Sequence, residues 1–468
     1  VSKMTKEFSD KFLEFLNNTG SPYHSVDETI KILKGSGFVK LDDNEEIKKG
    51  GKYYITLNYS TILAFKVGEE FDLEDERSMV VITGSHTDSP CLRVRPSSIT
   101  CNEGYTQLSV STYGGGLWHT WFDRGLGIAG KVVDNACNEY LIKIKRPICA
   151  IPNLAIHLTT SEERSSFVYD KEKHLQPIIS KTDTNDKYGE QLLSLPRSLL
   201  DEICREINVQ PQNISSFDLC LMDSVDSRYV GINDEFIDSP RLDNLGGVFS
   251  CFTALIDASE SNSSDLLISV AFDHEEVGSV SFSGAHSDFL KQSLKLILAG
   301  LENSNLNKST PKGVVNANRN SDLEFCKIMK RSIFLSVDMA HSIHPNYPER
   351  HQSKHKPSPN NGIVIKTNFN QAYTTDCTTR TFLKTIANNF NIKTQDFLVK
   401  NSSPCGSTIG PIVASNLGIR TADIGACMLA MHSCREFMYY SDIYDLQNFI
   451  KVFYMTWSKV KLESKLLE

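Results

Sequence analysis

The sequence predicts an α/β fold in which helices flank a mixed, mostly parallel central sheet and a smaller β-rich domain is inserted. Four near-continuous apolar runs have the length of strands buried on both faces of a sheet, at residues 78–83, 265–272, 332–337 and 420–424. Amphipathic helical patterns lie beside these runs in the chain. Between about 94 and 234 the sequence pattern changes to short strands of alternating hydrophobicity and a polar stretch, which indicates an inserted domain.

The N-terminal part predicts two helices followed by two strands. Apolar residues recur at helical spacing over 8–17 and 26–36, with a Ser-Pro turn between the two segments. Strand-like segments follow at 52–56 and 60–67. The first of the four apolar runs comes next, so the sheet is expected to begin in this part of the chain.

The middle of the chain predicts the inserted domain. We place it at 94–234, which leaves residues 1–93 and 235–468 to form one larger domain around it. Its expected elements are three strands and a polar stretch, at 106–112, 126–133, 154–158 and 161–190. After it, a helix is expected from Asp243 to about residue 259, and the polar segment 303–321 is expected to be a surface loop.

Composition limits the classes of function. A chain of 468 residues with 40% hydrophobic and 23% charged residues is typical of a globular protein of about two domains. The net charge of −8 argues against nucleic acid or an anionic membrane as the main partner. No segment has the pattern of a signal peptide or a membrane span, and the 12 Cys include no CxxC pair. We therefore expect a cytoplasmic protein with reduced thiols.

Carboxylates and imidazoles follow the four apolar runs or open the predicted helix. Ligands gather beyond the carboxyl ends of the strands in such sheets, so these side chains are expected to converge. Two imidazoles and four carboxylates suit a pair of divalent metals with one carboxylate left over as a base. The set is His86, Asp243, Glu275, Glu276, Asp338 and His432. The pattern predicts a two-metal hydrolase.

Each of these residues also has a simpler interpretation. His86 could be a surface residue, Asp243 a helix N-cap, and the Glu275-Glu276 pair a solvated acidic turn. Adjacent carboxylates are costly to bury unless a cation or a proton compensates them, so we assign Glu275 as base and Glu276 as ligand. Asp88, two residues after His86, could accept the second imidazole N–H, and we place it with Glu275 among the catalytic residues.

Five motifs resemble, in order, the aspartyl aminopeptidase family of co-catalytic zinc metallopeptidases: GSHTDSP, SPRLDNL, DHEEVGS, SVDMAHSIHPNY and CMLAMHSCRE. The resemblance covers almost the whole chain and implies a zinc-peptidase type of sheet. It implies that Asp243 bridges two zinc ions, with His86 and Asp338 completing one site and Glu276 and His432 the other. Manganese or cobalt could substitute, because the same oxygen and nitrogen ligands suit them.

The resemblance also implies substrate contacts at His119, His341, Lys366 and Tyr373, in addition to Glu275. His119 lies beside two tryptophans and could be a core residue, whereas the family offers this histidine to a neighbouring subunit's active site. Lys366 could be solvated, although a pocket for an acidic side chain needs such a cation. The family further implies that the inserted domain serves dimerisation or covers the site, and that dimers assemble into a tetrahedral dodecamer.

The function implied is removal of N-terminal Asp or Glu from peptides. As a hypothesis, water bridging the two metals attacks the first carbonyl while Glu275 takes its proton. Two alternatives stay open: the same chemistry with neutral, Leu-type specificity, or a self-assembling scaffold with a silent site. Related two-metal peptidases often have a cis peptide bond after the bridging Asp, so we expect one between Asp243 and Asn244.

Overall fold

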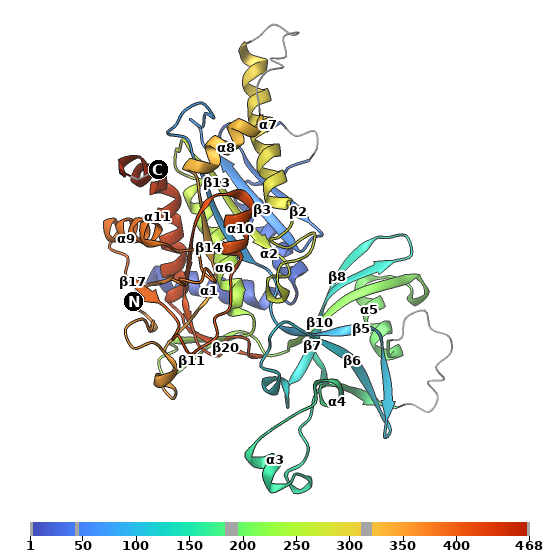
Figure 1. Ribbon diagram of the computed structural model, residues 1–468. Helices are drawn as coiled ribbons and strands as arrows, with labels where there is room; N and C mark the ends of the chain where they lie inside the picture. Colours follow the sequence, from blue (N-terminus) through green and yellow to red (C-terminus); the bar gives the residue numbers. More distant parts are fainter. Residues whose placement is uncertain (1–2, 43–45, 183–194, 310–320, 466–468) are drawn as a thin grey trace.

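The computed structural model describes residues 3–42, 46–182, 195–309 and 321–465, which form two lobes (Figure 1). The larger lobe contains a central sheet with helices on both faces, and the smaller lobe is a β-barrel. This arrangement confirms the predicted fold class. None of the helices in these described ranges is both long and apolar enough to cross a membrane.

The central sheet has nine strands, and the four in its middle are parallel. Across the sheet their order is β1 (Val39–Lys40), β2 (Lys52–Leu57), β3 (Thr61–Val67), β13 (Leu266–Phe272), β4 (Val80–His86), β14 (Ile333–Val337), β18 (Arg420–Gly425), β16 (Ile363–Lys366) and β17 (Thr394–Phe397). Strands β13, β4, β14 and β18 are parallel neighbours, whereas β3 pairs with β13 and β16 with β18 in antiparallel fashion. The four apolar runs are therefore the middle strands, and their carboxyl ends share one edge.

Alternation of side chains along these strands builds a core on each face of the sheet. On β4, Val81 packs into one hydrophobic cluster, while Val80 and Ile82 pack into the other. The first cluster is covered by five helices: α1 (Lys3–Asn18), α2 (Pro22–Gly35), α6 (Leu242–Ala258), α9 (Cys377–Asn389) and α11 (Asp442–Glu463). The second is covered by α7 (Phe289–Ser309), α8 (Ser321–Arg331) and α10 (Ile409–Leu417). Both predicted N-terminal helices are confirmed.

The smaller lobe is a closed six-stranded antiparallel barrel. Around the barrel its strands are β10 (Ile214–Asp223), β5 (Cys91–Asn102), β6 (Tyr105–Tyr113), β9 (Ile178–Lys181), β8 (Glu139–Ala150) and β7 (Gly125–Asp134). It has its own hydrophobic core, to which α5 (Arg197–Ile207) contributes Leu199 and Ile203. The expected strands at 106–112 and 126–133 are confirmed. The domain boundaries at 93/94 and 234/235 remain predictions.

The expected strand at 154–158 is wrong. A single 3₁₀ turn, η2 (Ile156–Leu158), occupies this segment, and Leu154, Ile156 and Leu158 are all exposed. Alternating apolar residues form a strand only where a partner edge is available, and this segment leaves the barrel after β8. The following polar stretch contains α3 (Ser161–Ser165), α4 (Lys171–His174) and β9, and its part from 183 onward lies outside the described residues.

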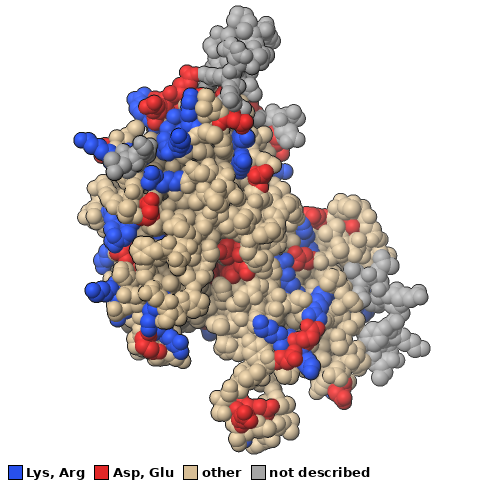
Figure 2. All heavy atoms as spheres, in the orientation of Figure 1, with Lys and Arg blue, Asp and Glu red and all other residues tan. Residues whose placement is uncertain are grey.

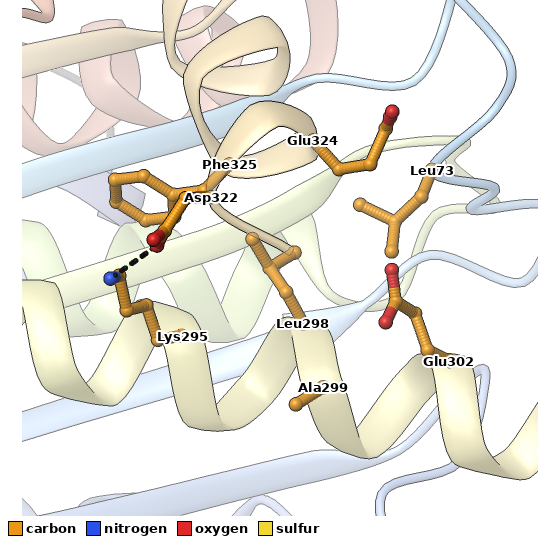
Figure 3. Close-up of a pocket in the computed structure, with 8 residues that line it drawn as sticks. All are labelled: Leu73, Lys295, Leu298, Ala299, Glu302, Asp322, Glu324 and Phe325. Carbon is orange, nitrogen blue, oxygen red and sulfur yellow. Dashed lines mark hydrogen bonds and ion pairs between the residues drawn. The ribbon is translucent and has the colours of Figure 1, made fainter. Parts of the chain in front are cut away.

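The expected loop at 303–321 is also wrong in part. Helix α7 continues to Ser309 and α8 begins at Ser321, while residues 310–320 lie outside the described part of the chain. A cavity of about 150 Å³ lies between these helices and Leu73, and Lys295 Nζ beside it is 2.8 Å from Asp322 Oδ1. Figure 3 shows the side chains that line it. None of the described residues that line this cavity belongs to the predicted site.

Two small sheets lie near the carboxyl edge of the main sheet. Strands β11 (Arg228–Val230), β12 (Phe236–Ser239) and β20 (Glu436–Tyr439) form a three-stranded sheet, and β15 (Ala340–His341) pairs in parallel with β19 (Cys427–Met428). Of these strands, β15 follows β14 in the chain, and β19 and β20 follow β18. They carry the C-terminal motifs past the edge of the main sheet.

Tyr454 links helix α11 to the middle of the sheet. Its buried hydroxyl donates to the Ile268 carbonyl at 2.7 Å and lies 2.6 Å from Thr83 Oγ1. We expect Tyr454→Phe to remove both buried hydroxyl contacts and to lower the free energy of unfolding by about 1–2 kcal/mol. Urea unfolding followed by tryptophan fluorescence measures this loss. Tyr444→Phe on the same helix, where the ring is only partly buried, is the matched control, and equal effects of the two changes would contradict the assignment.

Candidate metal centre

The predicted site residues converge at the carboxyl edge of the parallel strands. His86 ends β4, Asp338 follows β14, and Glu275 and Glu276 lie in η4 (Glu275–Val277) just after β13. His432 follows β19, and Asp243 lies at the start of α6. Figure 2 shows a compact group of acidic side chains near the middle of the visible face, between the two lobes. The architecture therefore brings residues from five separate segments together.

Asp243 is the centre of the group because each of its carboxylate oxygens faces a different imidazole. His86 Nε2 lies 3.4 Å from Asp243 Oδ1, and His432 Nε2 lies 3.3 Å from Asp243 Oδ2. His86 Nε2 is also 3.5 Å from Asp338 Oδ1, while His432 Nε2 is 3.3 Å from Glu276 Oε1. Two ligand sets share one aspartate, which is the geometry expected of a bridging carboxylate.

Three buried carboxylate oxygens lack a hydrogen-bond partner among the described residues: Asp243 Oδ1, Glu276 Oε1 and Asp338 Oδ1. An unsatisfied buried acceptor costs about 1–3 kcal/mol, and more when it is charged. Each of these oxygens faces one of the two imidazoles. Divalent cations between them would satisfy all three, so the residues present fit a pair of metal ions.

Glu275 lies at the edge of this arrangement. His86, Asp338 and Glu275 have ligand atoms close enough for one ion, as do His86, Asp243 and Glu276. Glu275 Oε2 is nevertheless 3.8 Å from His86 Nε2, farther than the facing oxygens of Asp243 and Asp338. This greater distance favours Glu275 as the uncoordinated carboxylate.

Burial and crowding shift the pKa values in the cluster. Burial, together with the charges of Asp338 and Glu276, raises the pKa of Glu275 well above its usual range, and burial raises the pKa of Glu276 to about 7. Burial lowers the pKa of His86, but the charge of Glu275 and contacts with Asp243 outweigh this, so its pKa is raised. Protons therefore compensate the charges when cations do not, and metal binding would displace them.

The simpler interpretations of these motifs do not hold. His86 is 2% exposed, and the Glu276 side chain is 5% exposed, so neither is a solvated turn residue. Asp243 is not the helix cap either, because Asn244 takes that role: its Oδ1 accepts the Gly247 N–H at 3.1 Å. A side chain at Gly247 would collide with Asn244. The expected cis peptide bond between Asp243 and Asn244 is confirmed.

Asp88 holds the turn that carries the two glutamates. Its carboxylate is fully buried and accepts the backbone N–H groups of Glu275 and Glu276, each at 3.1 Å. Its interaction with the imidazole differs from the sequence-based expectation. His86 Nδ1 is 3.0 Å from the Asp88 carbonyl oxygen and 3.3 Å from Oδ1, so the backbone is the nearer acceptor. The carboxylate mainly positions the turn.

The barrel lobe contributes directly to this site. At the end of β6, Tyr113 donates its hydroxyl to Asp88 Oδ2 at 2.7 Å. Two residues later the Gly115 carbonyl lies 3.1 Å from His432 Nδ1, and Leu117 N donates to the His432 carbonyl at 2.8 Å. The neutral His432 ring therefore has its Nδ1 proton toward the barrel and its Nε2 toward the carboxylates. We call residues 113–117 the barrel strap.

Glu436 is a site residue that the sequence reasoning missed. It is buried, and its two oxygens accept the backbone N–H groups of Asp243 at 3.0 Å and His432 at 2.7 Å. Burial beside Asp243 raises the pKa of Glu436 to about 8. Its position four residues after His432, in the quoted motif, was the available signal. One carboxyl group therefore fixes the backbone of two proposed ligands.

The predicted substrate contacts fall into two groups. Lys366 is 2% exposed, so it is not a solvated cation; its Nζ lies 3.3 Å from Asp338 Oδ2 and 5.3 Å from the centre of the Tyr373 ring. The His341 ring lies 5.7 Å from that of Phe397, in the same neighbourhood. His119 is exposed in η1 (Trp118–Trp121), so it is not a core residue. Within the described residues, no hydrogen bond or ion pair joins it to the cluster.

A buried aspartate organises the loops around Lys366 and Tyr373. Asp423 on β18 accepts the Thr374 N–H at 2.6 Å through one oxygen and the Thr408 hydroxyl at 2.6 Å through the other. Thr408 belongs to the small-residue segment 402–411 and caps α10 by accepting the Gly410 N–H. Asp423 thus connects the Tyr373 loop to this segment.

The comparison with protein families decides the class. The family described as "Aminopeptidase I zinc metalloprotease (M18)" matches residues 15–454. This chain belongs to the M18 family of metallo-aminopeptidases. Aspartyl aminopeptidase 1 of Schizosaccharomyces pombe is 40% identical over 449 residues, covering 91% of this chain and 90% of that protein.

Solved structures agree with the M18 assignment. A chain in the cryo-EM structure of the Ape4 and Nbr1 complex has a TM-score of 0.89 and 36% identity, and the match covers 100% of this chain and 90% of that chain. The structure of the Saccharomyces cerevisiae mApe1 dodecamer has a TM-score of 0.81 and 25% identity, with 98% of each chain covered. Both likenesses extend over the barrel as well as the sheet.

Replacement of Tyr113 tests whether the barrel strap supports the proposed metal centre. Tyr113→Phe removes a hydrogen bond to a buried carboxylate, an interaction worth about 1.5–3 kcal/mol. We expect kcat for a chromogenic aminopeptidase substrate to fall about tenfold or more, because the turn bearing Glu275 and Glu276 loosens. Tyr105→Phe, at the exposed start of the same strand, should leave kcat unchanged. Equal kcat in all three proteins would refute this role.

Proposed function

We propose that this M18 enzyme removes N-terminal Asp or Glu from peptides with the aid of two zinc ions per subunit. The observation that carries the proposal is the position of the Asp243 carboxylate, which faces His86 with one oxygen and His432 with the other. Neighbouring buried carboxylate oxygens have no hydrogen-bond partner among the described residues. His86, Asp338 and Asp243 would hold one ion, and His432, Glu276 and Asp243 the other. The names of the aspartyl aminopeptidase relatives support the acidic preference.

In this mechanism the chain's residues position the substrate and move the proton. Cations held by His86, Asp338, Asp243, Glu276 and His432 would supply Lewis acidity, which would lower the pKa of water and offset charge on the carbonyl oxygen. Glu275 takes the proton of the attacking water and passes it to the leaving amine. Asp88 holds Glu275 by accepting its backbone N–H, so the backbone of the base is fixed without a hydrogen bond from Asp88 to the Glu275 carboxylate.

We assign the preference for an acidic first residue to the basic residues beside the carboxylate cluster. Lys366, with His341 and Tyr373 beside it, offers a cation and donors to the side chain of the first residue. His119 is exposed and is assigned to the site of a second subunit, so assembly would complete the site. A dodecameric relative supports a homo-oligomer, for which we propose a tetrahedral dodecamer built from dimers through the barrel domain.

Replacement of the base separates chemistry from metal binding. We expect Glu275→Gln to reduce kcat by about 10²- to 10⁴-fold, the usual contribution of a general base, while the zinc content stays unchanged. Turnover of Asp-p-nitroanilide and elemental analysis measure the two effects. Glu302→Gln, on α7 and away from the cluster, is the control. Substantial residual turnover would overturn the base assignment.

Metal removal tests the centre as a whole. We expect elemental analysis to find two zinc ions per chain, and chelation to abolish activity until zinc is restored. Chelation should also lower the thermal midpoint, because free zinc at 100 times its Kd stabilises the fold by about 2.7 kcal/mol per site. Full activity and an unchanged midpoint after complete metal removal would exclude the proposed centre.

A substrate panel tests the specificity. We expect kcat/KM for Asp- and Glu-p-nitroanilide to exceed that for Leu and Ala by at least tenfold, because a buried cation left without an anion is penalised. Preference for Leu would establish the neutral specificity instead. Absence of all turnover in the zinc-loaded protein would favour a silent scaffold.

A further inference from the structure

A cavity of about 210 Å³ opens beside the predicted substrate contacts. His341 and Tyr373 form part of its wall, and two loops complete it: residues 350–355 after η5 (Pro348–Arg350) and residues 397–406 after β17. Arg350 and Lys400 line it together with three histidines, and none of the described lining residues is Asp or Glu. In a chain with a net charge of −8, a cavity with this composition selects anions.

The cavity continues outward from the acidic cluster. Lys366 contacts Asp338 on one side and lies over the Tyr373 ring on the other, and Tyr373 is 6.2 Å from Phe397 within the cavity wall. A peptide whose first carbonyl lies at the carboxylate cluster would therefore meet Lys366, His341 and Tyr373 first. Beyond them lie Arg350, His351, His355 and Lys400, which we call the outer wall.

The two cations of that outer wall have little internal compensation. Lys400 Nζ donates to the Glu349 backbone carbonyl at 2.8 Å, a neutral oxygen that leaves the charge of the lysine uncancelled. Arg350 Nε is 3.7 Å from Glu349 Oε1, and both side chains are well exposed, so this pair contributes little. Both cations can therefore interact with an incoming anion.

The two outer histidines are held in defined proton arrangements. His351 Nε2 accepts the His344 N–H at 3.1 Å, so the neutral ring has its proton on Nδ1 as a donor; burial and the charge of His344 lower its pKa. His355 Nδ1 lies 2.8 Å from Gln352 Oε1, and this amide oxygen accepts a hydrogen bond from the Nδ1–H group. The wall thus combines two cations with an imidazole donor.

We propose that this outer wall binds a carboxylate on the leaving part of the peptide, so that the enzyme reads a second negative charge beyond the first residue. The inference rests on the proposed function. The cavity extends past His341 and Tyr373 to the loops that carry Arg350 and Lys400, so it offers space beyond a side chain held at Lys366. The carboxylate can come from an acidic second residue or from the C-terminus of a dipeptide.

Matched peptides distinguish these two sources. Asp-Glu-amide against Asp-Gln-amide isolates a charge on the second side chain, and Asp-Ala against Asp-Ala-amide isolates the terminal carboxylate. We expect kcat/KM to be about fivefold to tenfold higher for the charged member of at least one pair at low salt, and the ratio to shrink at high salt. The pair that shows the ratio identifies the source.

The assignment to this wall is tested with Arg350→Gln and Lys400→Gln. Each change should bring the charged-to-neutral ratio toward one, while kcat/KM for Asp-p-nitroanilide, whose leaving group carries no carboxylate, stays within about twofold. Lys354→Gln is the matched control, since Lys354 lies in the same segment, is exposed and does not line the cavity. Arg350 is highly exposed, so its replacement leaves the fold intact even if Lys400→Gln does not.

Each outcome is decisive. A ratio of one for both pairs in the unaltered enzyme, with normal cleavage of Asp-p-nitroanilide, overturns the inference and leaves the proposed function in place. A ratio that persists in Arg350→Gln and Lys400→Gln also overturns it. Failure to cleave any Asp substrate removes the proposed function and the inference together.

Discussion

The structure depends on the burial of four carboxylates and two imidazoles against one another. Such a group is unstable alone, because desolvation and like charge both oppose it. Among the described residues its relief comes from protons and from the Lys366 ammonium beside Asp338, and three carboxylate oxygens remain without a hydrogen-bond partner. Most of the surrounding architecture can be understood as the means of holding these groups together until cations neutralise them.

Two kinds of support do this work. Parallel strands deliver the side chains to one edge, and buried acids then fix the backbone that carries them. Asp88 holds the turn of Glu275 and Glu276, and Glu436 holds Asp243 and His432. In each case one carboxylate fixes two site residues through their amides, so the positions of the proposed base and ligands are coupled in pairs.

The sequence could predict the parts of the fold that depend on local pattern. The buried strands and the residues at their ends were recognisable because continuous apolar runs require a sheet covered on both faces. Other features depend on tertiary partners. Leu154 and Leu158 alternate like a strand but have no edge to join, and Asp243 resembles a helix cap until Asn244 is seen to cap instead. Glu436 acts through the backbone amides of Asp243 and His432, so its place in the His432 motif does not by itself reveal its role.

The barrel strap has a consequence for how the two lobes can move. It contacts Asp88, which holds Glu275 and Glu276, and it contacts His432 through Gly115 and Leu117. Any rotation of one lobe against the other would pull on both halves of the centre at once. Opening of the two lobes would therefore require these three hydrogen bonds to break, and so would disturb the geometry of the centre.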